Sequence, residues 1–516
     1  MRKWLPLTAI CLGTFMLLVD VTIVNVALPQ MALDLHTSFG SLQWVLDIYA
    51  LALAALLMTA GAVADRFGRR RGYLFGLAVF AGASLACGLA PNAGLLIAAR
   101  AVQGIGGAAM FATTTALLST TYRGRDRGVA FGIWGAVAGA AAAAGPLAGG
   151  LLTQHLDWRW IFLVNLPVAV VAAALTLRVI PESRTENGAP VDLLGAGAFT
   201  VCASAVTYAL IRAGDKGWTS ASTLGLFGLG AVALAAFVVV EQRREAPMLD
   251  LALLRDPAFA TLIVAALLLN AAAFAQLVFT SLWLQSARGL SPVMAGLTGS
   301  APLSLVAFVV AGVGGRFLHR FPARLPIGGG LLLVGTGALL QTAVSAGSSW
   351  PALLAGELVT GLGVGMALPI MASTVLSAVP HERAGMAGGA LNAFRQIGFA
   401  LGIAVLGTVF ASRLQQSVSS DGSFADPHGI AQALTGGQAH AVIAGAPTAR
   451  RAAVEHAVRA AFAAGLDRVY LISGVVALVA GVLVLALVRP RRAAPVFVRD
   501  HAGLVRDTSS ETATPA

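Results

Sequence analysis

The chain has 516 residues, of which 57% are hydrophobic and only 11% are charged, whereas a soluble domain has about 25% charged residues. This composition excludes a water-soluble globular protein and favours one that lies in a lipid bilayer. The formal net charge of +11 does not indicate nucleic-acid binding, because the Arg and Lys residues stand in short runs between apolar segments and form no basic surface.

Apolar segments that are long enough to cross a bilayer, which takes about 20 residues each, recur along most of the chain. We predict an all-α integral membrane protein with about fourteen transmembrane helices. The predicted spans are residues 5–28, 41–63, 73–90, 94–120, 128–152, 160–179, 191–211, 221–240, 258–284, 293–315, 325–345, 350–376, 385–411 and 467–488. The first span has no convincing cleavage site, so we interpret it as a membrane helix and not as a signal peptide.

The basic residues predict the orientation of the chain, because loops on the cytoplasmic side of a membrane carry an excess of Lys and Arg. If the spans alternate in direction, the following arginines fall on one side: Arg66, Arg69, Arg70, Arg71, Arg123, Arg125, Arg127, Arg243, Arg244, Arg316, Arg320, Arg324, Arg383, Arg489, Arg491 and Arg492. We therefore expect a multi-pass protein of the plasma membrane with both termini in the cytoplasm.

Two polar segments are not predicted to span the membrane. Residues 412–466 are rich in Gly, Ser and Asp, and we predict a long external loop with one amphipathic helix near residues 450–462. Residues 491–516 have little apolar surface to bury, and we predict a disordered cytoplasmic tail. The three cysteines lie in apolar stretches without a metal-ligand spacing, so we expect packing residues and no metal site.

An internal repeat relates spans 1–6 to spans 9–14. The pattern Leu95-Leu96-x3-Arg100-x3-Gly104-x-Gly106 recurs as Leu353-Leu354-x2-Glu357-x3-Gly361-x-Gly363, and Arg66-Phe67-x2-Arg70 recurs as Arg316-Phe317-x2-Arg320. Transporters are commonly built from two such halves, with the substrate site between them. We predict a six-helix half at residues 1–180, two inserted helices and a linker at 181–250, and a second six-helix half at 251–490.

Ionisable side chains inside the hydrocarbon layer are expensive and point to function. Counting the helix rise from the span ends places Asp20, Asp47 and Arg100 at one depth, on the order of 9–12 Å below the outer surface. A carboxylate whose charge is opposed by burial and favoured by a nearby guanidinium is suited to taking up and releasing a proton. We predict proton coupling at these three residues; the alternative is a buried ion pair that only orients helices.

A substrate cavity is predicted to involve Glu357, Asn270 and Arg395. Glu357 is the repeat counterpart of Arg100, and an acid in a cavity could bind a cationic substrate or a proton. Arg395 stands beside Asn392 and Gln396 near the midplane of its span. A hydrogen-bond network between helices explains Arg395 as well as contact with an anion does.

The loop after the second span reads Gly61-Ala62-Val63-Ala64-Asp65-Arg66-Phe67-Gly68-Arg69-Arg70-Arg71. The positive charge of a cytoplasmic loop explains the arginines but neither the acid nor the glycines. Because glycine permits a tight turn and an acid beside arginines forms a breakable charge network, we predict a conformational latch. Its residues are Gly61, Asp65, Arg66, Gly68, Arg69 and Arg70.

The fifth span contains the run Gly145-Pro146-Leu147-Ala148-Gly149-Gly150. Small residues let helices approach closely, and a proline inside a helix produces a kink. The run predicts a closely packed, bent helix.

These patterns resemble those of a known family. The loop at residues 61–71 resembles motif A of the major facilitator superfamily, the stretch 96–106 resembles motif B, and Gly145, Pro146, Gly149 and Gly150 resemble motif C, the antiporter motif. The stretch Leu18-Val19-Asp20-x-Thr22-Ile23-Val24-Asn25-Val26-Ala27-Leu28-Pro29 resembles the first-helix motif of the fourteen-helix drug:proton antiporters. Trp158-Arg159-Trp160-Ile161-Phe162-x2-Asn165-x-Pro167 is similar to the stretch that opens their sixth helix.

The resemblance implies the major facilitator fold, with two six-helix bundles and two extra helices. It implies that Asp20 is the proton site, that Arg100 is tied to proton movement, and that Asp65, Arg66 and Arg70 form the latch. The second copy of the loop departs from the pattern, because Gly315 stands where Asp65 falls, so one half alone has the full latch.

We therefore predict a monomeric antiporter that exports amphiphilic or cationic drugs or antibiotics by alternating access. Its partners are the small-molecule substrate, protons and the lipid bilayer, and its energy source is a proton gradient, with no cofactor. The alternatives are a dedicated exporter of one endogenous metabolite, such as a self-made antibiotic, and an inward proton symporter. An enzyme is disfavoured, because we find no HExxH, no GxSxG and no nucleophile beside a plausible base.

Overall fold

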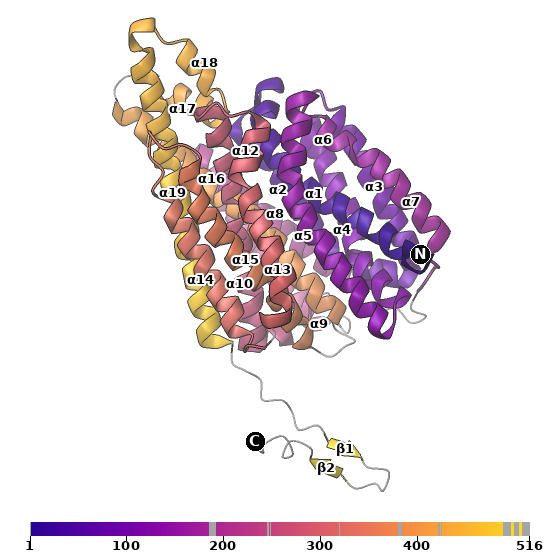
Figure 1. Ribbon diagram of the computed structural model, residues 1–516. Coiled ribbons are helices and arrows are strands. Elements are labelled where there is room, and N and C mark those ends of the chain that lie inside the picture. The colour runs from indigo at the N-terminus through magenta and orange to yellow at the C-terminus, as the bar shows by residue number, and fades with distance from the viewer. Residues whose placement is uncertain are drawn as a thin grey trace.

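Long helices that run between two ends of the molecule make up most of the structure, which is a computed structural model (Figure 1). It describes residues 2–184, 192–244, 247, 249–318, 320–379, 384–421, 424, 426–488, 497–499 and 505–507. The first half consists of η1 (Arg2–Trp4), α1 (Leu5–Asp34), α2 (Phe39–Phe67), α3 (Arg69–Gly88), α4 (Ala93–Thr121), α5 (Gly124–His155), α6 (Trp160–Leu163) and α7 (Asn165–Val179).

Two further helices, α8 (Leu193–Lys216) and α9 (Ala221–Arg243), precede the second half. That half consists of η2 (Leu251–Arg255), α10 (Pro257–Ala273), α11 (Gln276–Leu282), the π-helix η3 (Trp283–Ala287), α12 (Pro292–Gly299), α13 (Ala301–Leu318), α14 (Arg324–Gln341), α15 (Pro351–Ser377), α16 (Ala384–Asp421), α17 (Pro427–Thr435), α18 (Ala439–Ala444), η5 (Thr448–Arg450) and α19 (Arg451–Leu487).

The number of membrane spans agrees closely with the prediction. Eleven helices in the described part of the chain are long and apolar enough to cross a membrane, and there are up to 13 candidates if each of two bent pairs counts as one span. The bent pairs are α5 and α12–α13. The remaining predicted span, residues 325–345, is α14, which is 18 residues long, rich in glycine and packed along α15 and α19.

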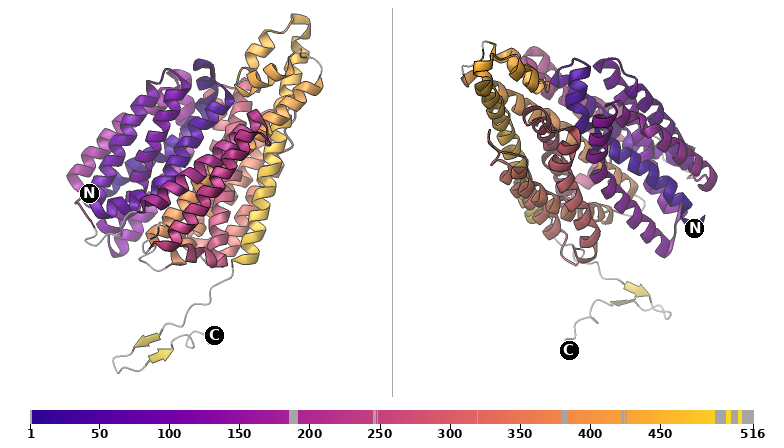
Figure 2. Two further views of the ribbon diagram at one scale, coloured as in Figure 1. Left: turned by 180° about the vertical axis from the view of Figure 1, so that it is seen from behind. Right: turned by 45° about the horizontal axis from the view of Figure 1, so that its top comes forward.

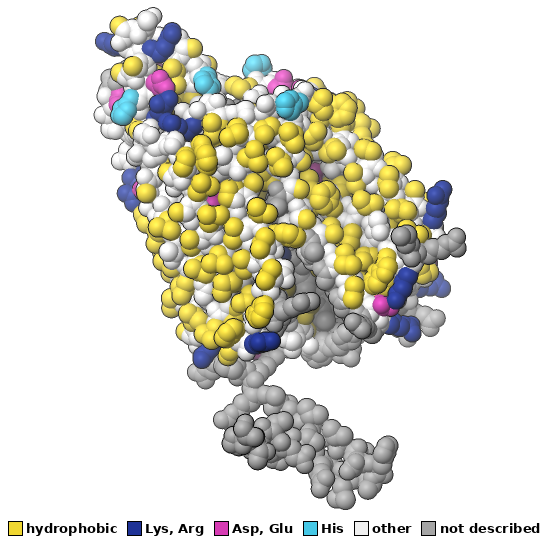
Figure 3. Space-filling model, in the orientation of Figure 1, with side chains coloured by type: hydrophobic (Ala, Val, Ile, Leu, Met, Phe, Trp, Pro, Cys, Tyr) yellow, Lys and Arg dark blue, Asp and Glu magenta, His cyan; other side chains and the backbone are white. Residues whose placement is uncertain are grey.

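Apolar side chains cover the flanks of the bundle, whereas charged side chains gather at its ends (Figure 3). The N-terminus lies at one end, which we call the N-terminal face, and the chain leaves the second half on the same side (Figure 1). This arrangement is the one expected of a membrane protein with an even number of spans.

The opposite end carries a helical cap, formed by the described residues of 412–466. The helix predicted near residues 450–462 is the first part of α19, whereas the rest of the segment, predicted as a loop, is also helical over most of its described residues. α16 and α19 are 38 and 37 residues long, well beyond the roughly 20 that cross a bilayer, and α17 and α18 join them above the bundle (Figure 1). Alanine-rich sequence with few helix breakers lets α19 begin at Arg451, well before its apolar part.

The two halves are separate bundles that touch through a few helix pairs. The contacts between them run from α1 to α11 and α12, from α2 to α16, and from α5 to α12 and α13. α8 packs against both α2 and α16, and α9 packs on α8. The halves converge at the cap end and diverge toward the N-terminal face (Figure 2).

Glycines give the two halves the same internal packing. In α4, a methyl group on Gly104 would overlap α2 at Tyr49, and one on Gly106 would overlap α3 at Gly76 and Phe80. The repeat counterparts in α15 behave alike, because Gly361 lies against Leu303 of α13 and Gly363 lies against Gly330 of α14. α4 and α15 therefore hold equivalent places in the two bundles.

Some predictions fall on residues that the structure does not describe. These are the side chains of Asp65, Arg125, Arg127, Arg316, Arg383, Arg489, Arg491 and Arg492. Within the tail at 491–516, only two short strands are described, β1 (Phe497–Arg499) and β2 (Val505–Asp507), which pair antiparallel. A two-stranded ribbon is marginally stable at best by itself, and disorder of the tail stays a prediction.

Candidate functional site

A fully buried ion pair lies in the centre of the first half. Asp20 of α1 is 0% exposed and Arg100 of α4 is 1% exposed, and the guanidinium Nη1 lies 2.6 Å from the carboxylate Oδ2. The two residues that the sequence placed at one depth are therefore in direct contact. Removing one partner of such a pair would leave an uncompensated charge in the protein interior.

Amide side chains complete the coordination of the Asp20 carboxylate. Gln103 donates from Nε2 to Oδ1 over 2.9 Å, and Asn165 donates from Nδ2 to the same oxygen over 3.1 Å. Both amides also bond to Ser84 Oγ of α3, and Arg100 donates to the Gln103 side-chain oxygen. Four helices, α1, α3, α4 and α7, thus supply one network around the Asp20 carboxyl group.

The guanidinium of Arg100 is held from its other sides as well. Its Nε donates to the backbone oxygen of Val45 in α2 over 3.0 Å. The ring of Tyr49, one helical turn further along α2, lies with its centroid 4.1 Å from the guanidinium carbon, a distance suited to a cation–π interaction. Phe162 of α6 lies on the outer edge of this contact, at 5.8 Å.

A break in the sixth span brings Asn165 to the site. α6 ends at Leu163 and α7 begins at Asn165, so the amide side chain projects from the first residue of the new helix. The same stretch places Trp158 and Arg159 on Asp34 at the cap end of α1, through a 3.1 Å hydrogen bond and a 2.8 Å ion pair. The sixth-span motif therefore joins the end of α1 to the buried network.

Asp47 is buried but does not join this network. It is 0% exposed, and neither carboxylate oxygen has a hydrogen-bond partner among the described residues. Gln43, one turn earlier on the same face of α2, donates to the backbone oxygen of Ile403 in α16. Asp47 therefore faces the contact between the two halves, while Val45 and Tyr49 on the other face hold Arg100.

The antiporter motif is a backbone contact surface. Gly145 and Gly149 lie against Thr22 and Ile23 of α1, and a methyl group on Gly150 would come within 2.6 Å of Val293 in α12. α5 is also bent by 40° just before Pro146. The prediction of close packing at a bend is confirmed, and the packing extends across the two halves.

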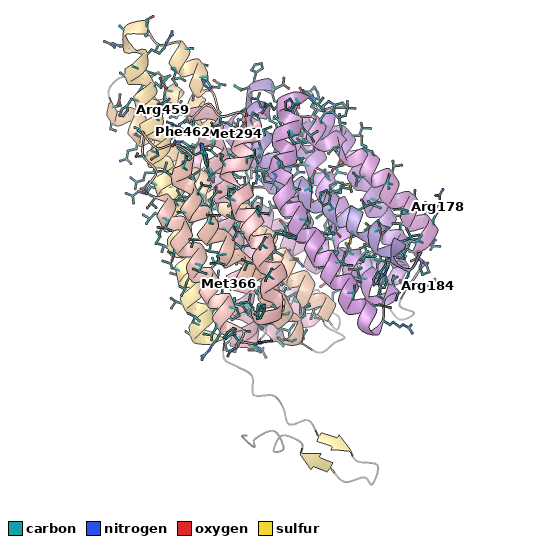
Figure 4. All side chains as sticks on the ribbon, in the orientation of Figure 1. Arg178, Arg184, Met294, Met366, Arg459 and Phe462 are labelled. Carbon is teal, nitrogen blue, oxygen red and sulfur yellow. The ribbon has the colours of Figure 1, made fainter. Side chains whose placement is uncertain are left out.

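A hydrogen bond and a close contact join the two halves at the cap end. Gln285 of η3 donates to the backbone oxygen of Val26 in α1 over 2.8 Å. In the cap, a methyl group on Gly437 would lie 3.7 Å from Pro29. Burial, followed by repulsion from Arg459, lowers the pKa of Arg288, and Figure 4 shows Arg459 in the part of α19 that belongs to the cap.

The predicted latch binds the carboxylate of Glu182, a residue of the same half. Gly68 ends α2 with φ of +118°, a conformation that favours glycine. Glu182, just after α7, accepts hydrogen bonds from the backbone N–H groups of Arg70 and Arg71 at the start of α3 (3.0 and 3.2 Å). An anion at a helix N-terminus is stabilised by the free N–H groups and the helix dipole.

Further contacts of the latch involve Gly61, Arg69 and Arg70. The side chain of Arg66 is exposed, a β-carbon on Gly61 would reach Ala112 of α4 at 3.8 Å, and Arg69 bonds from its backbone N–H to the Ser183 oxygen. Arg70 also donates from Nη1 to the oxygen of Ile180. The described contacts of the latch therefore lie within the first half.

The three residues predicted for the substrate cavity are not joined by any recorded bond between described atoms. Glu357 is completely buried and Asn270 donates to the Ala266 oxygen of its own helix. Arg395 is partly buried and donates to Asn392 Oδ1 over 3.2 Å, in line with the hydrogen-bond alternative.

Sequence reasoning did not identify Tyr49, Ser84 and Glu182. It included Gln103 and Asn165 only as members of the motif B stretch and of the sixth-helix stretch, without a role of their own. Gln103 follows Arg100 by one helical turn, and this spacing could have identified it. Ser84 carries no such signal, because a single serine in an apolar helix is common.

Comparison with known proteins places this arrangement in a family. Residues 10–403 match the Major Facilitator Superfamily. The chain is 39% identical over 415 residues to the multidrug resistance protein Stp of Mycobacterium tuberculosis, covering 80% of this chain and 77% of that protein. It is 33% identical over 495 residues to the tetracenomycin C resistance and export protein of Streptomyces glaucescens, covering 94% and 91%. The chain therefore belongs to the major facilitator superfamily, a family of transporters.

Solved structures with the same fold include a bacterial homolog of the human lysosomal transporter Spinster, with a TM-score of 0.64, 19% identity, and coverage of 95% of this chain and 97% of that one. The human organic anion transporter MFSD10 has a TM-score of 0.61, 16% identity, and coverage of 93% and 99%. These structures confirm the all-α major facilitator fold. The relatives named for multidrug resistance and for antibiotic resistance and export confirm the predicted likeness to drug exporters of this superfamily.

Proposed function

We propose that the protein is a proton-coupled antiporter that exports amphiphilic or cationic drugs or antibiotics across the plasma membrane. The proposal is carried by the enclosed Asp20–Arg100 pair, which joins a titratable carboxyl group to a fixed cation in the core of a transporter. The relatives named for multidrug resistance and for antibiotic export support the substrate class. Both termini are cytoplasmic in this proposal, and the N-terminal face is the cytoplasmic one.

The geometry supports a simple coupling cycle. In the present conformation the halves meet at the cap end, so the transporter faces the cytoplasm, and Asp20 is held ionised by Arg100, Gln103 and Asn165. When the halves rock apart at the cap end, Asp20 becomes accessible from outside and binds a proton. The neutral carboxyl group releases Arg100, and the rearranged network favours the return to the cytoplasm-facing state, where the proton leaves.

Asp47 takes part through the contact between the halves. Its unpaired carboxyl group faces α16, so it is best accommodated as the neutral acid while that contact is closed. The cycle needs no cofactor, because the proton gradient supplies the energy, and one chain contains both halves, so the proposed unit is the monomer.

Gradient-driven transport tests this function. Purified protein in liposomes with an imposed pH gradient should move a fluorescent lipophilic cation, and Asp20→Asn should abolish driven transport but retain passive exchange. Asp421→Asn, at the exposed end of α16, is the matched control and should transport normally. Unimpaired driven transport by the Asp20→Asn protein would refute the assignment.

The second candidate is a dedicated exporter of one endogenous metabolite, which is favoured by the relative named for a single antibiotic. A resistance profile of cells with and without the protein separates the two functions. Protection against many unrelated lipophilic cations supports the leading proposal, and protection against one compound supports the second.

A further inference from the structure

The second half contains a buried carboxyl group that the proposed cycle does not use. Glu357 in α15 is 0% exposed, and neither of its carboxylate oxygens has a hydrogen-bond partner in the described part of the chain. Asp20 is equally buried but accepts hydrogen bonds from three side chains. A buried carboxylate without a partner is strongly disfavoured over the neutral acid, so Glu357 holds its proton in this conformation.

Glu357 occupies the place in the second half that Arg100 occupies in the first. Glu357 stands four residues before Gly361, as Arg100 stands four residues before Gly104. The glycines after these two residues pack α15 and α4 against equivalent neighbouring helices. Glu357 and Arg100 therefore hold equivalent positions in the two bundles. Each points into the interior of its own bundle.

The surroundings of Glu357 are polar but uncharged at neutral pH. Tyr470 of α19 lies within electrostatic range of the carboxyl group, and its hydroxyl is 2.8 Å from Thr280 Oγ1 of α11. From α14, Gln341 packs against Gly356, the neighbour of Glu357. No ion pair to Glu357 is recorded from any described Arg, Lys or His, so a proton is the cation that neutralises this group.

The burial of Glu357 indicates that it binds a proton and not the substrate. In this conformation the halves diverge toward the N-terminal face, where a substrate would enter from the cytoplasm (Figure 2). A group that binds the substrate should be accessible there, whereas Glu357 has no exposed surface. A proton is small enough to reach an enclosed group, and a drug-sized cation is not.

We propose that Glu357 is a second proton-binding site, one that is protonated in this conformation while Asp20 is ionised, and that exchanges its proton during transport. This proposal rests on the proton-coupled function proposed above and adds a second titratable site to it. Each half then carries at least one exchangeable proton, and the number of protons exchanged per substrate exceeds one.

The proton-to-substrate ratio tests the exchange. In liposomes, a substrate gradient is set against a pH gradient, and the pH difference that gives zero net flux reports the ratio. We expect the ratio to fall by one in Glu357→Gln and to be retained in Glu357→Asp and in the control Asp421→Asn. An unchanged ratio in Glu357→Gln would overturn the proposal. Loss of downhill exchange in a folded Glu357→Gln protein would overturn it too, because that result indicates contact with the substrate.

Infrared difference spectroscopy tests the protonation state independently of transport. We expect the spectrum of the purified protein at neutral pH to lose one carboxylic acid C=O component in Glu357→Gln and to keep it in Asp20→Asn. Persistence of the full band in Glu357→Gln would overturn the proposed protonation. If the unmodified protein shows no proton coupling, the proposed function fails and exchange at Glu357 fails with it, whereas the infrared result still reports whether the site holds a proton.

Discussion

The backbone oxygen of Pro146 in α5 occupies the space that a β-carbon on Gly296 in α12 would need. At this point α5 and α12 therefore meet through backbone atoms, with no side chain between them. Gly150 continues this contact one turn further along α5, where it lies against Pro292 and Val293. A surface of this kind tolerates almost no added volume.

Gly296→Leu should force the halves apart at the cap end and favour the outward-facing conformation. The measurement is the reaction of a cysteine at position 26 with a membrane-impermeant thiol reagent applied from outside, in a protein without its native cysteines. We expect the rate to rise at least several-fold. The control is Gly135→Leu on α5, because no described atom of a neighbouring element lies within 4 Å of its β-carbon position. Equal rates in the two variants would contradict the prediction.

Arg100→Leu should destabilise the protein strongly, because it leaves the Asp20 carboxylate buried without a cation. Breaking a buried pair in this way costs about 3–5 kcal/mol. The double variant Asp20→Asn/Arg100→Leu removes both charges and should recover part of the loss. Thermal unfolding in detergent compares the stability of the unmodified protein, the two single variants and the double variant. If the effects of the two substitutions simply add, the two side chains are not coupled.

Glu182→Gln should loosen the start of α3. The amide side chain keeps the size of the carboxylate but removes the charge that faces the N–H groups of Arg70 and Arg71, a loss of about 0.5–1 kcal/mol. Hydrogen exchange of those two amides should become faster by a few-fold. Arg184→Gln is the control from the same exposed segment, near the N-terminal face (Figure 4), and it should leave the rates unchanged. Identical exchange in both variants would argue against the Glu182 contact.

A disulfide between positions 29 and 437 should lock the cytoplasm-facing conformation. The β-carbon of Pro29 lies 3.7 Å from the β-carbon position of Gly437, within the range that disulfides require. Pro29→Cys/Gly437→Cys should lose transport on oxidation and regain it on reduction. Each single variant should be insensitive to the oxidant. Full transport by the cross-linked protein would show that the cap does not need to separate from α1.

Hydropathy predicts the transmembrane helices well because burial in lipid and burial in the bundle both select apolar residues. It cannot tell where a helix leaves the membrane. Residues 451–466 are polar enough to be excluded from a span, yet they form the first part of α19, because alanine-rich sequence remains helical outside lipid. The sequence therefore predicted the helix near residues 450–462 as separate from the last span, whereas the two are one continuous helix.

The candidate site could be predicted in part, because charges in apolar helices are conspicuous. Depth alone grouped Asp20, Arg100 and Asp47, but depth does not give the direction of a side chain around its helix. Asp47 lies two residues from Val45 and from Tyr49, and so on the opposite face of α2. Glu182 could not be linked to the latch, because the contact depends on how the end of α7 meets the start of α3.

The cap has a practical consequence in the proposed orientation. The described residues of 412–466 project from the bundle as a helical structure that carries charged side chains, whereas apolar side chains cover the flank of the bundle below them (Figure 3). An antibody fragment that binds α17 and α18 would reach the transporter without crossing the membrane. By holding Gly437 against Pro29, such a binder would act as an inhibitor that the pump cannot expel.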